Sequence, residues 1–185
     1  MNAAQAASLP LIAFGITEFV LRRGDTAKTL KTTATDRGTT AIIFGCYAIV
    51  VCVLCVPKLP GIALPAVLGW IGIGVAVAGL ALRWWAMTVL GRFYTRTLIT
   101  TSDQNVVTRG PYRWIRHPGY LGSLMTWVGA AAASLNLIVV ILVAGLLLIA
   151  YWRRISAEEI MLAEKLGRPY VDYRESSWRL VPFVW

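Results

Sequence analysis

Charged residues are scarce in this sequence. Only 15% of its 185 residues are Asp, Glu, Lys or Arg, and 57% are hydrophobic. Soluble domains contain about 25% charged residues, so the composition argues against a water-soluble globular protein. Acidic residues are half as frequent as basic ones: the chain has 9 Asp and Glu and 18 Lys and Arg. The basic residues lie scattered between apolar runs and form no stripe, which argues against nucleic acid as a partner.

Metal-ligating side chains are also few. The chain has one histidine, His117, and three cysteines, Cys46, Cys52 and Cys55. The spacing of Cys52 and Cys55 resembles half of a zinc site, but such a site needs four ligands and no second pair completes them. All three cysteines fall inside one apolar run, where a small thiol is an ordinary packing residue. We therefore expect no metal site.

Long apolar runs are what the sequence has in abundance. Runs 38–57 and 59–82 are uncharged, and each reaches the roughly 20 residues that cross a hydrocarbon core of ~30 Å. Run 1–17 has neither a basic start nor a small-residue cleavage motif, so we interpret it as a retained helix and not as a signal peptide. These runs predict two N-terminal spans within 1–56 and a third span within 59–90.

The longest uncharged stretch, 119–152, is too long for one span and short for two. Ser134-Leu135-Asn136 near its middle supplies a turn. We therefore predict a helical hairpin whose arms of about 15 residues rise only ~23 Å each. The fold class expected from these observations is all-α: a polytopic integral membrane protein of one domain, 1–185, with about five transmembrane helices, the last two forming the short hairpin.

Positive charge is segregated in this five-span arrangement. Every Lys and Arg except Lys58 falls in segments 22–39, 83–118 and 153–185, which share one side of the membrane if five spans alternate. Basic residues are enriched in cytoplasmic loops. The N-terminus is therefore predicted to lie outside, and the C-terminal segment 153–185 in the cytoplasm. The short chain and the style of its loops favour a bacterial inner membrane as the location.

One acidic residue falls within the first span. Glu18 lies near its predicted cytoplasmic end, and an acidic group at membrane depth is a candidate for function. Arg22 follows four residues later on the same helix face. We interpret Glu18 as a residue that reaches the interface or pairs with Arg22.

The segment before the hairpin, 106–120, combines basic, aromatic and turn-forming residues. Gly110-Pro111 is expected to stop any regular element, and Pro118 suits the first turn of a helix because its missing N–H would be unpaired there. His117 then lies at a helix entrance, where backbone N–H groups favour a carboxylate or phosphate. A structural role for His117 is equally compatible with the sequence, and the arginines here could instead meet anionic lipid headgroups.

A second group of polar residues follows the hairpin. Arg154 and Glu158 are four residues apart on a helix, so they share a face and can form a salt bridge. Alternatively, the planar guanidinium of Arg154 binds a carboxylate, and Glu158 accepts hydrogen bonds from an ammonium or a ribose hydroxyl. Because the hairpin folds back, we expect this face to return close to His117 and Tyr120.

Taken together, these motifs resemble the isoprenylcysteine carboxyl methyltransferase family and its relatives among phospholipid N-methyltransferases. The shared motifs are Gly110-Pro111-Tyr112, Arg116-His117-Pro118-x-Tyr120-x-Gly122, Arg154-Ile155-x-x-Glu158-Glu159-x-x-Leu162, Gly167-x-x-Tyr170-x-x-Tyr173 and Pro182-Phe183. The resemblance covers about residues 91–183. In addition, Asp36-Arg37-Gly38-Thr39 looks like a segment common in bacterial members.

The resemblance implies S-adenosyl-L-methionine as the cofactor, held by the cytoplasmic segment 91–118 and the start of the hairpin. The residues that it implicates in cofactor binding are Gln104, Asn105, Val106, Val107, Tyr112, His117, Pro118, Gly119, Tyr120 and Glu158. Gln104 departs from the family pattern, because eukaryotic members tend to have histidine there. Arg154 corresponds to the arginine proposed to bind the carboxylate of the substrate. The residues expected to support the site are Arg116, Glu159, Tyr170 and Tyr173.

The function that the resemblance implies is methyl transfer to a lipophilic acceptor, with membrane lipids around the site. Arg154 favours carboxyl O-methylation of a prenylcysteine-like or other lipid-linked carboxylate. This reaction needs alignment and shielding from water more than a general base, since a carboxylate is already ionised at neutral pH. A phospholipid headgroup N-methyltransferase is the alternative enzyme. A small membrane scaffold or transporter is the alternative that is not an enzyme, although a permeation path would need polar residues along the spans.

Overall fold

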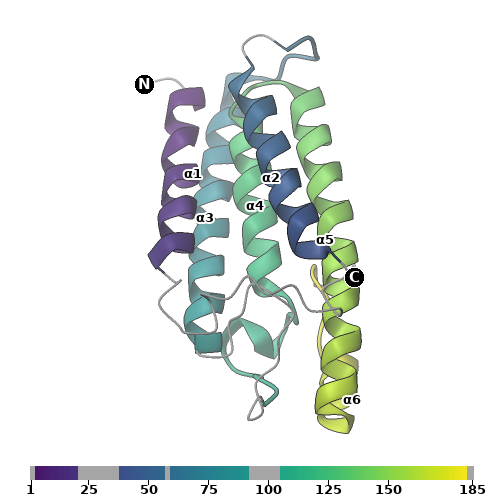
Figure 1. Ribbon diagram of the computed structural model, residues 1–185. Helices are drawn as coiled ribbons and strands as arrows, with labels where there is room; N and C mark the ends of the chain where they lie inside the picture. Colours follow the sequence, from purple (N-terminus) through teal and green to yellow (C-terminus); the bar gives the residue numbers. More distant parts are fainter. Residues whose placement is uncertain (1–2, 21–37, 57–58, 92–104, 183–185) are drawn as a thin grey trace.

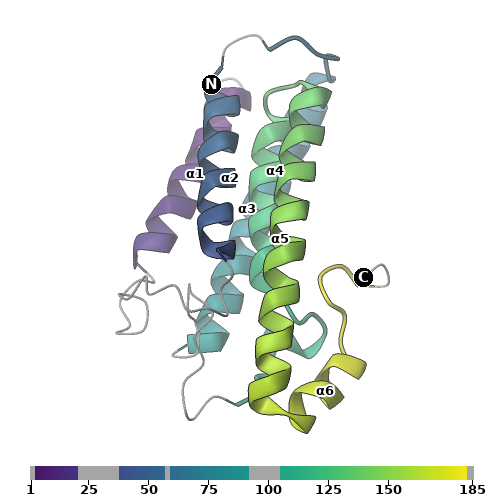
Figure 2. The ribbon, with the colours of Figure 1, turned by 45° about the vertical axis from the view of Figure 1, so that its right-hand side comes forward.

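The computed structural model describes residues 3–20, 38–56, 59–91 and 105–182. Its elements are α1 (Ala3–Val20), α2 (Thr39–Cys55), α3 (Ala66–Leu90), the 3-10 helix η5 (Gly110–Arg113), α4 (Pro118–Ala132), α5 (Leu137–Leu166) and α6 (Arg168–Glu175). Helices α1 to α5 run alternately down and up in one bundle, and α5 extends below the others to α6 (Figures 1 and 2). The described residues contain isolated bridges but no strand, which confirms the all-α class.

The hairpin predicted in 119–152 is present as α4 and α5. Leu135 in its turn adopts a left-handed backbone, with φ 55°. Asn136 caps α5 by accepting hydrogen bonds from the N–H groups two and three residues on, at 3.0 and 3.4 Å, and donates to the carbonyl of Leu59 at 2.9 Å. Beyond the apolar run, α5 continues without a break to Leu166, giving a helix of 30 residues. The second arm of the hairpin and the polar residues after it, including Arg154 and Glu158, therefore belong to one continuous helix.

The third span differs from the prediction at its start. Residues 59–65 are not helical, because Pro60 and Pro65 disfavour a helix in the residues before them. Instead, this segment lies against the hairpin turn, where Leu64 donates its N–H to the carbonyl of Leu135 at 2.8 Å. At its other end α3 continues past the uncharged run to Leu90.

Close packing of α3 against α4 depends on glycine. A Cβ added to Gly129 would lie 2.4 Å from the carbonyl oxygen of Gly72, and one added to Gly122 would lie 2.6 Å from that of Gly79. Small residues let two apolar helices approach until their backbones touch, which is a common way to pack helices in lipid. This contact holds the start of α4 in place beside α3.

Replacing Gly79 by alanine is expected to destabilise the bundle by about 1–3 kcal/mol, because the new methyl group would force α3 and α4 apart. The added Cβ would lie 2.6 Å from the Gly122 carbonyl oxygen. Gly74→Ala on the same helix is the matched control, since a Cβ there meets no atom within 4 Å. Thermal unfolding in detergent, followed by circular dichroism, measures both variants. Equal melting temperatures for the two would contradict this account of the packing.

The centre of the bundle is aromatic. Tyr47 of α2 stacks on Trp127 of α4 with ring centroids 5.1 Å apart, and Phe14 of α1 meets Trp127 edge-on at 5.5 Å. The hydroxyls of Tyr47 and Tyr151 lie 2.9 Å apart. Because Tyr151 is fully buried, this cluster fixes α5 one helical turn before Arg154.

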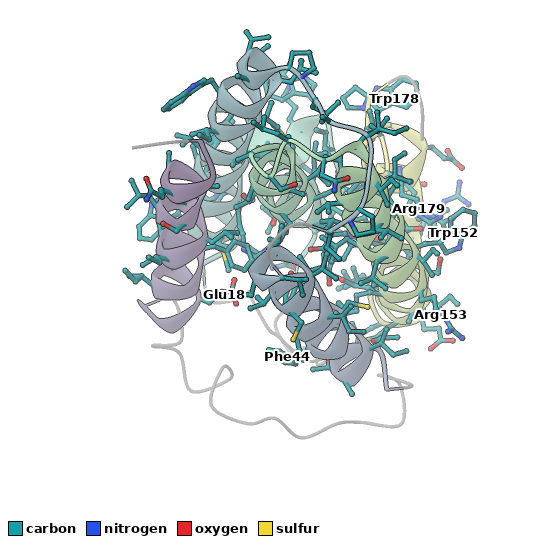
Figure 3. All side chains as sticks on the ribbon, turned by 90° about the horizontal axis from the view of Figure 1, so that it is seen from above. Glu18, Phe44, Trp152, Arg153, Trp178 and Arg179 are labelled. Carbon is teal, nitrogen blue, oxygen red and sulfur yellow. The ribbon has the colours of Figure 1, made fainter. Side chains whose placement is uncertain are left out.

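Glu18 has a described partner that the sequence did not indicate. It lies on the side of α1 that faces the other helices (Figure 3) and forms an ion pair with Arg83 of α3, whose Nε donates at 3.0 Å. Arg83 also donates from Nη1 to the Ser123 hydroxyl at 2.6 Å and to the Gly119 carbonyl at 3.1 Å. The predicted partner, Arg22, lies outside the described residues. Arg83 was assigned to a loop because the uncharged run ends before it, but α3 continues and buries it.

The outer surface of the bundle is apolar. Two described helices, α3 and α5, are long and apolar enough to cross a membrane, and α2 is apolar but shorter. Exposed apolar side chains include Ile12, Phe44, Ile71, Ile141 and Ile149. Seen from above, Phe44 and Trp152 point away from the other helices (Figure 3). Such a surface suits contact with lipid, while the five-span count stays a prediction.

Candidate functional site

Two proline residues shape the segment that enters the site. Gly110, with φ 60°, and Pro111 were expected to stop regular structure, but they begin the short 3-10 turn η5. Pro118 occupies the first turn of α4, as predicted, and His117 is the residue before it. The result is a compact corner that delivers residues 116–120 to the face of α5.

Arg154 is the centre of the first polar cluster. It is buried, with 3% of its surface exposed. Its Nε donates to the Tyr120 hydroxyl at 3.1 Å, and that hydroxyl donates to Glu158 at 2.8 Å. Nη1 donates to the hydroxyls of Thr39 and Thr40 at 2.8 and 3.0 Å. The structure thus brings Arg154, Glu158 and Tyr120 together, as the hairpin predicted, and adds the start of α2.

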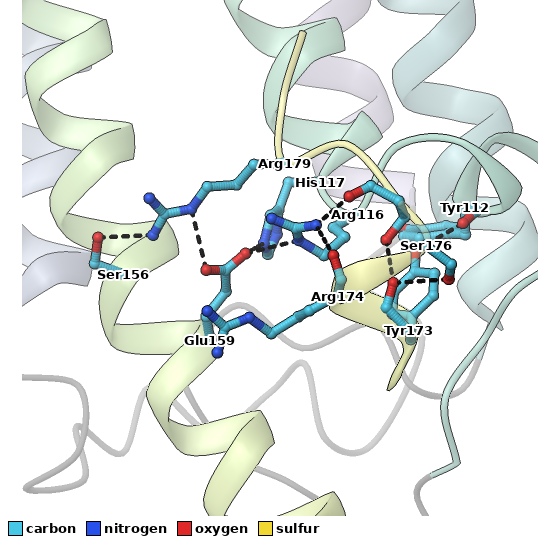
Figure 4. Close-up of polar contacts among 10 residues, drawn as sticks. Tyr112, Arg116, His117, Ser156, Glu159, Tyr173, Arg174, Ser176 and Arg179 are labelled. Atoms are coloured by element: carbon cyan, nitrogen blue, oxygen red, sulfur yellow. Dashed lines mark hydrogen bonds and ion pairs between the residues drawn. The ribbon is translucent and has the colours of Figure 1, made fainter. Parts of the chain in front are cut away.

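Glu159, the residue after Glu158 on α5, is the centre of the second cluster (Figure 4). One carboxylate oxygen accepts from Arg116 Nε at 2.9 Å and lies 3.2 Å from His117 Nε2. The other oxygen forms an ion pair with Arg179 Nε at 3.1 Å, and Arg179 also donates to the Ser156 hydroxyl at 2.9 Å. A single buried carboxylate therefore joins the corner before α4, helix α5 and the C-terminal segment.

The environment of Glu159 keeps it ionised. Burial by itself raises the pKa of a carboxyl group, but the hydrogen bonds and charges of His117, Arg116 and Arg179 outweigh burial and lower the pKa of Glu159 to about 2. This carboxylate serves as a charged anchor, because a group with so low a pKa stays deprotonated near neutral pH.

The C-terminal segment is tied to the corner before α4. Tyr173 donates its hydroxyl hydrogen to the Tyr112 carbonyl at 2.7 Å. The backbone of Trp178 pairs with that of Trp114 and Arg116, each through a hydrogen bond of 2.8 Å. Both tyrosines expected to support the site, Tyr170 and Tyr173, are buried here. These contacts hold α6 and the residues after it against the corner before α4.

Tyr170 stands out because its buried hydroxyl has no hydrogen-bond partner among the described residues. Burial, followed by the negative charges of Glu159 and Glu158, raises the pKa of Tyr170. The hydroxyl therefore keeps its proton and remains available as a donor beside the two carboxylates. Burial likewise raises the pKa of Tyr173 to about 12.

The remaining predicted cofactor residues differ in their surroundings. Gln104 lies outside the described residues; Asn105 is exposed, and Val106 and Val107 are half-buried. A Cβ added to Gly119 would meet no atom within 4 Å. In the part of the chain that the structure describes, no group of three or more His, Cys, Asp or Glu side chains is placed to hold a metal ion.

The sequence did not single out four residues of the clusters, Thr39, Thr40, Ser156 and Arg179. Thr39 and Thr40 belong to an apolar run more than 100 residues before Arg154, so no local pattern connects them. Arg179 was counted only as one basic residue of the tail. The likeness of Asp36-Arg37-Gly38-Thr39 to a segment of bacterial family members includes Thr39 but indicated no role for it.

Comparison with known proteins identifies relatives of the chain. Residues 70–164 match the profile of the Isoprenylcysteine carboxyl methyltransferase (ICMT) family. The chain is 31% identical over 117 residues to the probable protein-S-isoprenylcysteine O-methyltransferase of Oryza sativa subsp. indica, covering 62% of this chain and 61% of the relative. It is 33% identical over 115 residues to protein-S-isoprenylcysteine O-methyltransferase B of Arabidopsis thaliana, covering 61% and 58%. The matches span less than two thirds of these relatives.

The fold also resembles a solved structure. The chain superposes on the eukaryotic intramembrane Ras methyltransferase ICMT, determined without a monobody, with a TM-score of 0.68 and 18% sequence identity. The superposition covers 98% of this chain and 68% of that protein. This likeness concerns the arrangement of the helices, including the first two, which the family profile does not cover.

Proposed function

Because the chain belongs to the isoprenylcysteine carboxyl methyltransferase family, we propose that it transfers a methyl group from S-adenosyl-L-methionine to the carboxylate of a prenylcysteine-like or other lipid-linked acceptor. The observation that carries the proposal is Arg154, a buried guanidinium joined through Tyr120 to Glu158. A planar guanidinium matches a carboxylate geometrically. The apolar outer surface of the bundle suits the lipid part of the acceptor.

The residues around Glu158 fit the cofactor. Its carboxylate can accept hydrogen bonds from the amine or the ribose hydroxyls of S-adenosyl-L-methionine. The first turn of α4 lacks a side-chain cap and is open beside Gly119, so its N–H groups suit the cofactor carboxylate. The Tyr170 hydroxyl, buried and without a partner among the described residues, supplies a further donor. The other proposed cofactor contacts are Tyr112, His117, Pro118, Tyr120, Asn105, Val106, Val107 and Gln104.

When bound, S-adenosyl-L-methionine supplies an electrophilic methyl group on a sulfonium sulfur. Arg154 holds the acceptor carboxylate in its ionised, nucleophilic form and orients it. Glu159 fixes the corner that carries His117 and Arg116, and α6 helps to exclude water. Acceleration then comes from orientation and desolvation. A phospholipid amine would need a proton acceptor and would gain nothing from a guanidinium beside the nucleophile, so we favour the carboxylate.

The membrane arrangement that we propose has five spans, with the N-terminus outside and the site cytoplasmic, in a bacterial inner membrane. Exposed tryptophans support two interfaces: Trp70 lies near the start of α3, and Trp84 and Trp85 lie near its end. Tryptophan is enriched where a bilayer meets water. Fourteen residues of helix between them rise about 21 Å, within reach of a thin or locally compressed bilayer.

The direct test is a methylation assay with labelled S-adenosyl-L-methionine. The purified protein in lipid nanodiscs is offered farnesylcysteine analogues, fatty acids, isoprenoid acids and aminophospholipids. We expect label in base-labile methyl esters of a lipophilic carboxylate, identified by mass spectrometry. Label in phospholipid amines alone would replace this proposal by the N-methyltransferase alternative. Absence of both cofactor binding and label would overturn the proposed activity.

Substitution of Glu158 by alanine is expected to weaken cofactor binding about 10- to 100-fold, because charged hydrogen-bond acceptors are worth about 1.5–3 kcal/mol each. Isothermal titration with S-adenosyl-L-methionine measures the affinity. Glu164→Ala is the control, since Glu164 is exposed further along the same helix. Unchanged affinity in Glu158→Ala would remove Glu158 from the cofactor site.

A further inference from the structure

The first turn of α2 reaches across the bundle to Arg154. The hydroxyls of Thr39 and Thr40 accept hydrogen bonds from the same nitrogen, Nη1, at 2.8 and 3.0 Å. Both threonines are buried, with 6% and 7% of their surfaces exposed. In Figure 2 the lower end of α2 lies against the middle of α5, where the apolar part of α5 gives way to its polar extension. Residues far apart in the chain therefore meet at one guanidinium.

Neither threonine is the N-cap residue of α2. The residue before the helix is Gly38, with φ 73°, and the helix start has no side-chain cap. Threonine before or at a helix start ordinarily turns its oxygen to the backbone N–H groups of its own helix. Their shared contact with Arg154 is thus a specific arrangement.

The three described hydroxyl contacts fix the plane of the guanidinium. Tyr120 of α4 holds Nε, and the two threonines of α2 hold Nη1. A planar group bound at two of its nitrogens cannot rotate, and an arginine otherwise has several rotatable bonds to freeze. Hydroxyl oxygens orient the guanidinium without adding negative charge beside it.

We propose that Thr39 and Thr40 are positioning residues of the acceptor site, which hold Arg154 in the orientation that binds the substrate carboxylate. This inference rests on the proposed function. It makes α2 part of the acceptor half of the site, although the family profile matches only residues 70–164. The cofactor half, around Glu158 and α4, does not depend on the threonine hydroxyls.

The test removes both hydroxyls and keeps the side-chain shape. In the double variant Thr39→Val/Thr40→Val, kcat/KM for the acceptor identified by the methylation assay is expected to fall about 10- to 100-fold. The Kd for S-adenosyl-L-methionine is expected to stay within twofold. Thr39→Ser/Thr40→Ser restores the hydroxyls and is expected to recover kcat/KM to within about threefold. Thr88→Val is the control, because Thr88 bonds only to the carbonyl of Trp85 on its own helix among the described contacts.

A double-mutant cycle separates positioning from a general effect on structure. Acceptor binding is measured by titration in Arg154→Ala with and without the valine substitutions. If the threonines act through Arg154, the substitutions weaken binding in the wild-type background and add nothing in Arg154→Ala. If the double variant does not fold, the single variants Thr39→Val and Thr40→Val carry the same comparison.

Two results overturn the inference while leaving the proposed function intact. One is an active wild-type protein whose valine variants keep kcat/KM within twofold. The other is a serine variant as impaired as the valine variant. A wild-type protein that binds the cofactor but methylates no carboxylate contradicts the proposed function instead. In that case the affinity for the acceptor is compared directly. If wild type and Thr39→Val/Thr40→Val bind the acceptor equally well, the positioning role is rejected too.

Discussion

Arg154→Ala is expected to lower methyl transfer at least 100-fold, while the affinity for S-adenosyl-L-methionine stays within a few-fold. The guanidinium is the proposed contact of the acceptor carboxylate, and loss of one partner of a buried charged pair costs about 2–5 kcal/mol. The cofactor half of the site retains Glu158 and the start of α4, so cofactor binding is preserved. Single-turnover rates and isothermal titration measure the two quantities separately.

The neighbouring arginine provides a matched control. Arg153 is exposed and points outward beside Trp152 (Figure 3), so Arg153→Ala is expected to retain the wild-type rate. Arg154→Lys tests geometry at constant charge, and we expect it to recover only part of the rate because an ammonium lacks the planar fork. Loss of cofactor binding in Arg154→Ala, with acceptor binding unchanged, would assign Arg154 to the other half of the site.

Glu159→Gln is expected to destabilise the protein by about 3–5 kcal/mol, the usual effect of removing one partner from a buried ion-pair network. The substitution keeps the size of the side chain but leaves Arg116 and Arg179 without their shared carboxylate. We also expect weaker cofactor binding, because the corner that carries His117 loses its anchor. Thermal unfolding in detergent and titration with S-adenosyl-L-methionine measure these effects.

Glu164→Gln is the control for this substitution, since Glu164 is exposed on the same helix. The dependence on pH gives an independent check. The pKa of Glu159 is lowered from 4.5 to about 2 in the folded protein, so its contribution is fully present above about pH 4.5 and is lost as the pH falls toward 2. The difference in stability between wild type and Glu159→Gln should therefore shrink over this range. A constant difference from pH 6 to 2 would contradict the role of the charge.

Local sequence signals predicted much of the site. Pro118 begins α4 and Asn136 caps α5 through contacts within a few residues of each, so the chain itself encodes both ends of the turn. The folding back of the hairpin then brings Tyr120 to Arg154 and Glu158. The resemblance to the family added Tyr170 and Tyr173 as residues expected to support the site. Both are buried in the structure.

Charge was a less reliable guide to position. Arg83 follows an uncharged run, so it was assigned to a loop. The suggested pairing of Glu18 with Arg22 lies outside the described residues and stays a prediction. In the structure α3 carries Arg83 into the bundle, where Glu18 compensates its charge. Residue type alone cannot distinguish an arginine that ends a span from one that pairs within it, because the partner comes from another helix.

The sequence by itself determined the helical class, the hairpin and the group of residues near Arg154, because these depend on apolar length, proline and glycine, and spacing along one helix. Only the tertiary structure decided that Thr39 and Thr40 hold Arg154 and that Glu159 joins Arg116, His117 and Arg179. Such contacts join residues from 20 to 115 positions apart. They depend on how the helices pack across one another, and the hydrophobic periodicity of a single helix does not reveal that packing.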